Sequence, residues 1–249
     1  MKHSFLDKYS NLNSPLHRID PRGKLITFIL SIGIIVSEPR EEIKGIFFYY
    51  LIIVILLSLS RIPLKYILKR CLLVSPIIIM AAAFLPLSYI PGWKDLSEGM
   101  RGQVFSFSLS LILKVFAAVI LLTLLTSTEK FNRLLDGLRK LKMPSVLGMI
   151  SALMYRYVFI LNDEILRIKL ARESRTPGKI RISRFKIFGN QAAMIFIRSW
   201  SRAQIVYNTM LSRGFNGDFH DFKDLSFTMN DALFVIIILS AMVLIRVFL

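Results

Sequence analysis

Long apolar blocks constrain this chain more than any other feature of its sequence. A helix needs about 20 predominantly apolar residues to cross the hydrocarbon core of a bilayer. Five blocks approach or reach that length, at residues 25–37, 45–60, 72–91, 104–126 and 232–249. Asp20-Pro21 marks the start of the first helix, since an N-cap residue is followed by proline at the first helical position. The blocks predict an all-α membrane protein with about five transmembrane helices, the first two forming a tight hairpin.

Basic residues set the expected orientation of these spans. The chain carries a net charge of +17 although 54% of its residues are hydrophobic, and soluble basic proteins are usually more polar than this. Five Lys and Arg lie in 1–24 and four in 61–70, whereas the alternate loops hold two each. Cytoplasmic loops carry the excess of Lys and Arg. We therefore expect a multi-pass protein of the inner or plasma membrane with a cytoplasmic N-terminus.

The segment between the fourth and fifth blocks then falls in the cytoplasm. Residues 127–228 hold 18 Lys and Arg against 8 Asp and Glu. The predicted organisation is 1–126 with transmembrane helices 1–4, a cytoplasmic domain of long amphipathic helices at 127–228, and a C-terminal transmembrane helix at 229–249. Membrane topology and lipid headgroups explain this charge without nucleic acid.

Apolar periodicity predicts three helices inside the cytoplasmic domain. Apolar positions recur at helical spacing over 184–213, and similar patterns cover 145–175 and, more briefly, 129–141. The first half of 145–175 is apolar enough to dip into the membrane. Arg156 argues against a full span there, because a charged residue at mid-bilayer costs about 2.5–3.5 kcal/mol on insertion scales.

The two long predicted helices end alike. One closes in Ser174-Arg175-Thr176 and the other in Ser212-Arg213-Gly214, so each has Ser-Arg in its last turn before a helix stop. The helix macrodipole stabilises cations there by about 0.3–1 kcal/mol each, and on helix physics alone this explanation is favoured. The functional alternative is that two long helices present arginines to acidic grooves on a partner, a task that suits the planar guanidinium.

The sequence offers no catalytic constellation. Cys71 is the single cysteine and the three histidines lie far apart, which excludes a cysteine-based metal centre and a helical histidine pair. Asp218, His220, Asp221 and Asp224 crowd one segment, but no regular ligand spacing links them, and we favour a polar turn. We predict no enzyme activity, no catalytic residues, no metal site and no cofactor bound by this chain.

Three segments carry a resemblance to a known family. The run 13–25, Asn-Ser-Pro-Leu-His-Arg-Ile-Asp-Pro-Arg-Gly-Lys-Leu, resembles the opening of CbiQ, a transmembrane component of energy-coupling factor (ECF) transporters. Tyr155-Arg156-Tyr157 with Glu164 resembles the start of the family's coupling helices, and the two Ser-Arg endings resemble its paired Ala-Arg-Gly motifs. The resemblance covers nearly the whole chain, which is similar to the CbiQ/EcfT type and to its cobalt-uptake branch.

This resemblance implies a scaffold and not a catalyst. In such ABC-type importers two cytoplasmic subunits bind and hydrolyse ATP, a separate membrane subunit captures the substrate, and the transmembrane component couples them. The domain 127–228 would then be a coupling domain, in a system for cobalt or related nickel uptake with a link to cobalamin biosynthesis. The resemblance implies that the ATPases are contacted by Ser174, Arg175 and Thr176 and by Ser212, Arg213 and Gly214. Serine replaces alanine in both motifs and Thr176 replaces glycine, so Arg172 becomes an alternative first contact.

Lys114 motivates a different function. An ionisable residue inside an apolar block is a functional candidate, and the prolines at 76 and 86 interrupt the third block, so the chain alone could be a channel or carrier for an ion or small solute. A lysine facing the bundle or reaching the interface explains Lys114 equally well. The expected partners remain two ATP-binding subunits, a substrate-binding membrane subunit and the lipid bilayer, without nucleic acid.

Overall fold

The structure is a computed structural model that describes Ser10 and residues 14–38, 43–88, 98–175, 184–217 and 227–248. Every regular element in these ranges is an α-helix. The chain divides into two compact units, a larger one formed by 2–141 with 224–249 and a smaller one formed by 142–223. The predicted all-α class is confirmed.

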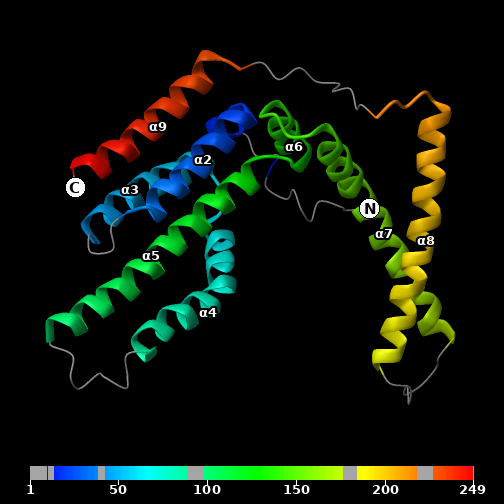
Figure 1. The fold of residues 1–249 in the computed structure, drawn as a ribbon, viewed down its shortest axis with the longest axis horizontal. Coiled ribbons are helices and arrows are strands. Elements are labelled where there is room, and N and C mark those ends of the chain that lie inside the picture. The colour runs from blue at the N-terminus through cyan, green and yellow to red at the C-terminus, as the bar shows by residue number, and fades with distance from the viewer. Residues whose placement is uncertain are drawn as a thin grey trace. The chain divides into compact units, whose positions relative to one another are not determined.

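The larger unit contains the apolar helices predicted as spans. Its described helices are α1 (Pro15–Arg18), α2 (Pro21–Val36), α3 (Ile43–Ser60), α4 (Leu64–Ser88), α5 (Glu98–Thr128), α6 (Phe131–Lys140) and α9 (Met229–Phe248). The helix α2 contacts α5, α6 and α9, while α5 also packs against α3 and α4 (Figure 1). Helices α2 and α5 therefore form the centre of this unit.

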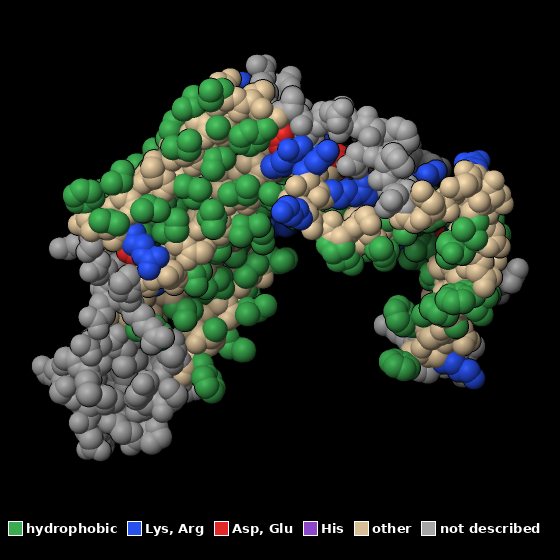
Figure 2. Space-filling model, turned by 45° about the horizontal axis from the view of Figure 1, so that its top comes forward, with side chains coloured by type: hydrophobic (Ala, Val, Ile, Leu, Met, Phe, Trp, Pro, Cys, Tyr) green, Lys and Arg blue, Asp and Glu red, His purple; other side chains and the backbone are tan. Residues whose placement is uncertain are grey.

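Several of these helices are suited to a bilayer. Length and composition allow a crossing by Leu64–Phe84, Phe105–Thr128 and Met229–Phe248. The apolar part of α3, Gly45–Ser60, is shorter, and the 16 residues of α2 extend only about 24 Å, so both need flanking residues to cross a core about 30 Å thick. Hydrophobic side chains cover much of the face shown in Figure 2, as expected for a surface in contact with lipid.

The structure corrects the start of the third span. The apolar pattern predicts a loop at 61–70, but α4 begins at Leu64 and continues to Ser88. That prediction was wrong because it took the start of the apolar block as the start of the helix, although Lys and Arg favour helices nearly as well as leucine. Pro76 lies inside this continuous helix, which bends along its course in Figure 1.

Hydrogen bonds fasten the start of α2 to the start of α9. As predicted, Asp20 caps α2, accepting the N–H of Arg22 at 2.8 Å with Pro21 at the first helical position. The Asp20 N–H in turn donates to Asp231 Oδ1 at 2.9 Å. Thr228 donates its N–H and its hydroxyl to the other oxygen of that carboxylate, at 2.8 and 2.6 Å. The Asp231 carboxylate is thus fully engaged in the junction.

A buried ion pair joins α2 to the connection between α5 and α6. The Lys24 ammonium pairs with the Glu129 carboxylate, and their side chains are 0% and 1% exposed. Arg133 lies 3.7 Å from the second carboxylate oxygen. The pair therefore buries two opposite charges against each other.

Two glycines allow α6 and α9 to approach α2 closely. A Cβ atom at Gly137 would lie 3.2 Å from Leu25 and 3.3 Å from Pro21, and one at Gly23 would lie 3.2 Å from Val235. Small residues at helix contacts are typical of packing in membranes, where backbones must approach without a hydrophobic driving force. The charge pattern assigns α6 to the predicted cytoplasmic domain, and in the structure α6 packs against α2.

The smaller unit consists of α7 (Ser145–Arg175) and α8 (Arg184–Ser212). The bounds of α7 are those predicted, and α8 ends one residue before the predicted end. By length and composition Ser145–Ser174 could also cross a membrane. Arg156 is exposed near its middle and still argues against a full span. The number of spans and the division of the chain at 127 and 229 stay predictions.

Candidate functional site

The helices α7 and α8 cross as an antiparallel pair. The Glu164 carboxylate pairs with the Arg198 guanidinium. Beside this pair lies a groove of about 360 Å³, lined by the first half of α7, the second half of α8 and Phe215. Its apolar lining includes Met149, Leu153, Met154, Tyr157, Leu161, Ala203, Val206 and Met210. Methionine side chains adapt to irregular contacts, so this groove suits packing that must tolerate small displacements of the helices.

A Schellman motif ends α8. Gly214 has a φ of +81°, its N–H donates to the Leu211 carbonyl at 3.0 Å, and the Phe215 N–H donates to the Met210 carbonyl at 3.1 Å. Met210 and Phe215 line the same groove, as the hydrophobic contact of this motif requires. Gly214 is therefore the predicted helix stop. It fixes the backbone beside Arg213, whose side chain is exposed.

The two motif serines make the same local hydrogen bond. Ser174 Oγ donates to the Leu170 carbonyl at 3.0 Å, and Ser212 Oγ donates to the Asn208 carbonyl at 2.9 Å. Both residues are exposed. Because each hydroxyl bonds to its own helix four residues back, serine in place of alanine adds little bulk at either helix end.

The first motif is described only in part. Arg175 is the last residue of α7, and its side chain, together with Thr176, lies outside the described residues. Arg172 Nη2 lies 3.7 Å from the Glu173 carboxylate, and the Arg172 side chain is 33% exposed. A partly exposed pair of this kind is worth about 0–1 kcal/mol, so it does not hold Arg172 away from a partner. The choice between Arg172 and Arg175 as the first contact stays a prediction.

The C-terminal ends of α7 and α8 lie at opposite ends of the hairpin. Figure 1 shows the end of α8 far from the end of α7, as antiparallel crossing near Glu164 and Arg198 requires. From this crossing, a rise of 1.5 Å per residue along each helix separates Arg175 and Arg213 by at most about 40 Å. The two motifs are therefore equivalent in sequence but point to two separate contact regions.

Lys114 has a structural partner in the larger unit. Its Nζ donates to the Glu38 carbonyl at 2.8 Å, and the Tyr49 hydroxyl donates to Glu38 Oε2 at 2.9 Å. Arg246 donates to the nearby Ser37 carbonyl at 3.5 Å. Cations commonly satisfy the last carbonyls of a helix. Lys114 thus closes the C-terminal end of α2, which supports the structural interpretation of this lysine.

The chemistry available at the helix ends is that of a docking surface. Within the described ranges, no group of three or more His, Cys, Asp or Glu side chains could hold a metal ion. Asp218, His220, Asp221 and Asp224 lie outside those ranges. What α8 presents is an exposed guanidinium on a fixed helix end, and guanidinium groups bind carboxylates through paired hydrogen bonds.

Comparisons with known proteins cover most of the chain. The family model CbiQ, cobalt transport protein, matches residues 12–223. An uncharacterized protein of Methanocaldococcus jannaschii is 29% identical over 96% of this chain and 86% of its own length. The energy-coupling factor transporter transmembrane protein EcfT of Bacillus subtilis is 28% identical over 87% of this chain and 86% of its own. A fused cobalt transport protein, CbiMQ, of Methanocorpusculum labreanum is 26% identical over 82% of this chain and 35% of its own.

Proposed function

Because the chain belongs to the CbiQ family of cobalt transport proteins, we propose that it is the transmembrane coupling subunit of an ECF-type importer. The family is one of transporter membrane components and not of enzymes. In the proposed role, the chain passes movements of two ATP-binding subunits to a separate membrane subunit that captures the substrate. ATP binds to those partners and not to this chain.

The arrangement of α7 and α8 carries this proposal. Two ATPase subunits need two contact regions, and an antiparallel hairpin places its two C-terminal ends on opposite sides of the crossing. Each end has a Ser-Arg pair. The Schellman motif at Gly214 fixes the direction in which Arg213 leaves the helix. Arg213 can then enter an acidic groove without first ordering its backbone, which lowers the entropic cost of docking.

In this role α7 and α8 move together. The Glu164–Arg198 pair and the apolar groove hold α7 against α8, so a force on one helix end is shared by both helices. Movement reaches the spans through the chain itself, since α7 follows α6 and α9 follows α8. The close contact of α6 with α2 at Gly137 restricts movement of α6 relative to α2. A displacement of α7 is therefore passed to α2 through α6.

The proposed cargo is cobalt, or the related nickel. The family description and the name of the fused relative support cobalt. That relative also supports a second membrane subunit, because this chain spans 35% of its length. Contacts to the metal would lie on that other subunit. The cytoplasmic N-terminus is part of the same proposal, since the hairpin must meet ATPases in the cytoplasm.

Charge reversal at Arg213 tests the coupling role. Arg213→Glu and Arg167→Glu each reverse the charge of an exposed arginine of the hairpin, but only the first lies at the proposed contact. After co-expression with its ATPase and substrate-binding subunits, Arg213→Glu should reduce co-purification of the ATPases at least about tenfold, because a guanidinium–carboxylate contact becomes repulsive. Arg167→Glu should retain them.

Two further results would contradict the proposal. One is unchanged co-purification after Arg175 and Arg213 are both replaced by Glu. The other is cobalt flux into vesicles that contain this chain alone, which would favour the channel or carrier alternative. That alternative has lost its main support, because Lys114 bonds to the Glu38 carbonyl.

A further inference from the structure

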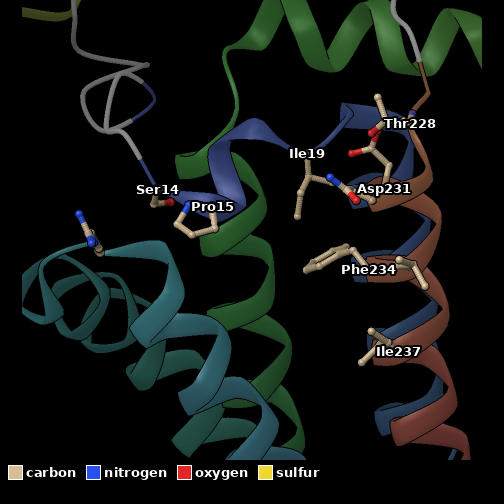
Figure 3. Close-up of a pocket in the computed structure, with 10 residues that line it drawn as sticks. Ser14, Pro15, Ile19, Thr228, Asp231, Phe234 and Ile237 are labelled. Atoms are coloured by element: carbon tan, nitrogen blue, oxygen red, sulfur yellow. Dashed lines mark hydrogen bonds between the residues drawn. The ribbon is translucent and has the colours of Figure 1, made fainter.

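A pocket of about 680 Å³ opens in the larger unit. It lies between α1, the turn that joins α3 to α4, and α9 (Figure 3). Its lining consists of Ser14, Pro15, Ile19, Arg61, Thr228, Asn230, Asp231, Leu233, Phe234 and Ile237. The pocket therefore joins the polar start of the unit to the apolar side of a spanning helix.

The pocket changes from polar to apolar along α9. Asn230 lies in the first turn of that helix, Leu233 and Phe234 follow one turn later, and Ile237 follows after another. In Figure 3, Phe234 and Ile237 lie successively further from Thr228. From Asn230 to Ile237 this stripe is about 10 Å long. A ligand that fits must have a polar end and an apolar tail.

Arg61 supplies a cation at the polar end. It has a φ of +55°, a left-handed conformation that is uncommon for residues other than glycine and costs roughly 1–2 kcal/mol. Its side chain is exposed, and it forms no ion pair with another described residue. Strained residues cluster where a ligand is held. The strain and the charge together point to an anionic group as the polar end of the ligand.

The carboxylate of Asp231 already accepts hydrogen bonds from neighbouring groups. It is 4% exposed, one of its oxygens accepts the Asp20 N–H, and the other accepts the N–H and hydroxyl of Thr228. Its oxygens therefore serve the junction between α2 and α9, and these hydrogen bonds partly offset its negative charge. The cation of Arg61 remains available to the pocket.

We propose that this pocket binds one anionic phospholipid of the surrounding leaflet, with its phosphate at Arg61 and an acyl chain along Leu233, Phe234 and Ile237. Charge favours such a lipid over a neutral one, because Arg61 is followed by further basic residues on the first turns of α4 and each Lys or Arg near a membrane surface attracts anionic lipid. The site is independent of the proposed coupling role and of the cargo.

Lipid retention by the purified full-length chain tests this site. The chain is reconstituted in vesicles of phosphatidylcholine with a minor share of phosphatidylglycerol, extracted in mild detergent, and examined by native mass spectrometry. We expect one retained phosphatidylglycerol per chain. Arg61→Gln should reduce its retention at least about fivefold. Lys65→Gln, which removes the same charge from an exposed position outside the pocket, should not.

A second pair of variants tests the apolar part of the pocket. Ile237 and Ile236 are 61% and 62% exposed, but only Ile237 lines the pocket. Ile237→Trp should displace the lipid, and Ile236→Trp should leave it bound. Arg61→Gly suits the left-handed backbone and removes the cation, so it should lose the lipid while unfolding at a higher temperature than the unmodified chain. This variant separates lost binding from lost folding.

Several results would overturn the proposal. Equal retention of phosphatidylcholine and phosphatidylglycerol would show a lipid surface without headgroup recognition. Equal losses in Arg61→Gln and Lys65→Gln would show general surface charge. Retention of free glycerol phosphate without the lipid would show an anion site with no role for the acyl chain. Crosslinking of a photoreactive residue at position 237 to a partner subunit, and not to lipid, would show a protein interface.

Discussion

The buried pair of Lys24 and Glu129 gives a stability prediction with a definite asymmetry. Glu129→Leu leaves the Lys24 ammonium, 0% exposed, without its carboxylate, and removing one partner of a buried pair costs about 3–5 kcal/mol. Lys24→Met should cost less, because Arg133 remains 3.7 Å from the Glu129 carboxylate. The double variant should recover most of the loss, because replacing both partners leaves neither charge of the pair buried alone.

Thermal unfolding of the purified chain in detergent measures these differences. For a chain of this size about 1 kcal/mol corresponds to roughly 2–4 °C in Tm, so Glu129→Leu should lower Tm by about 6–20 °C. Glu164→Gln serves as the control, because it breaks the pair with Arg198, whose side chain is 54% exposed, and exposed pairs contribute about 1 kcal/mol or less. Equal losses in Tm for Glu129→Leu and Glu164→Gln would contradict a buried, desolvated pair at Lys24. A double variant less stable than both single variants would contradict it as well.

Two pairs of glycines give further predictions. In each pair the same substitution is made at one position where a side chain is disfavoured and at one where there is space for it. Gly214→Ala should loosen the last turn of α8, seen as faster amide exchange there, because alanine at a φ of +81° is less stable by roughly 1–2 kcal/mol. Gly189→Ala, inside the same helix with nothing within 4 Å of the new Cβ, should instead slow exchange by favouring the helix by about 1 kcal/mol; equal effects would argue against the Schellman motif. Gly137→Val should lower Tm by about 2–12 °C, for an overpacking cost of about 1–3 kcal/mol, since its Cβ meets α2 within 3.3 Å. Gly33→Val, whose Cβ meets nothing within 4 Å, should change Tm much less, and a similar loss at both positions would contradict close packing of α6 on α2.

The sequence predicts those helix starts and ends that depend on only a few neighbouring residues. The Asp20-Pro21 pair, the bounds of α7 and the stop at Gly214 all follow from caps, periodicity and backbone conformation within a few residues. The start of α4 was missed for a local reason too, because hydrophobicity was used where helix propensity was decisive. These features needed no knowledge of the rest of the chain.

Contacts between distant segments were beyond the reach of the sequence. Lys24 and Glu129 are 105 residues apart, and no local sequence pattern around either residue predicts the ion pair. Lys114 looked equally suited to a transport path and to packing, and only its bond to the Glu38 carbonyl distinguishes the two. The periodicity of α6 gave a helix but not its partner. The matching Ser-Arg pairs at the ends of α7 and α8 also did not indicate that the two helices are antiparallel. Their C-terminal ends therefore lie at opposite ends of the hairpin.

The fastenings of α2 have a consequence for how the protein is made. This helix leaves the ribosome before α5 and α9, because the carboxylate that pairs with Lys24 comes 105 residues later and the one that receives the Asp20 N–H comes 211 residues later. At about 5–20 residues per second, those delays are roughly 5–20 s and 10–40 s. The Lys24 ammonium of α2 therefore has no carboxylate partner while the helix is being inserted. The contacts that hold α2 in its final position are complete only after α9 has been synthesised.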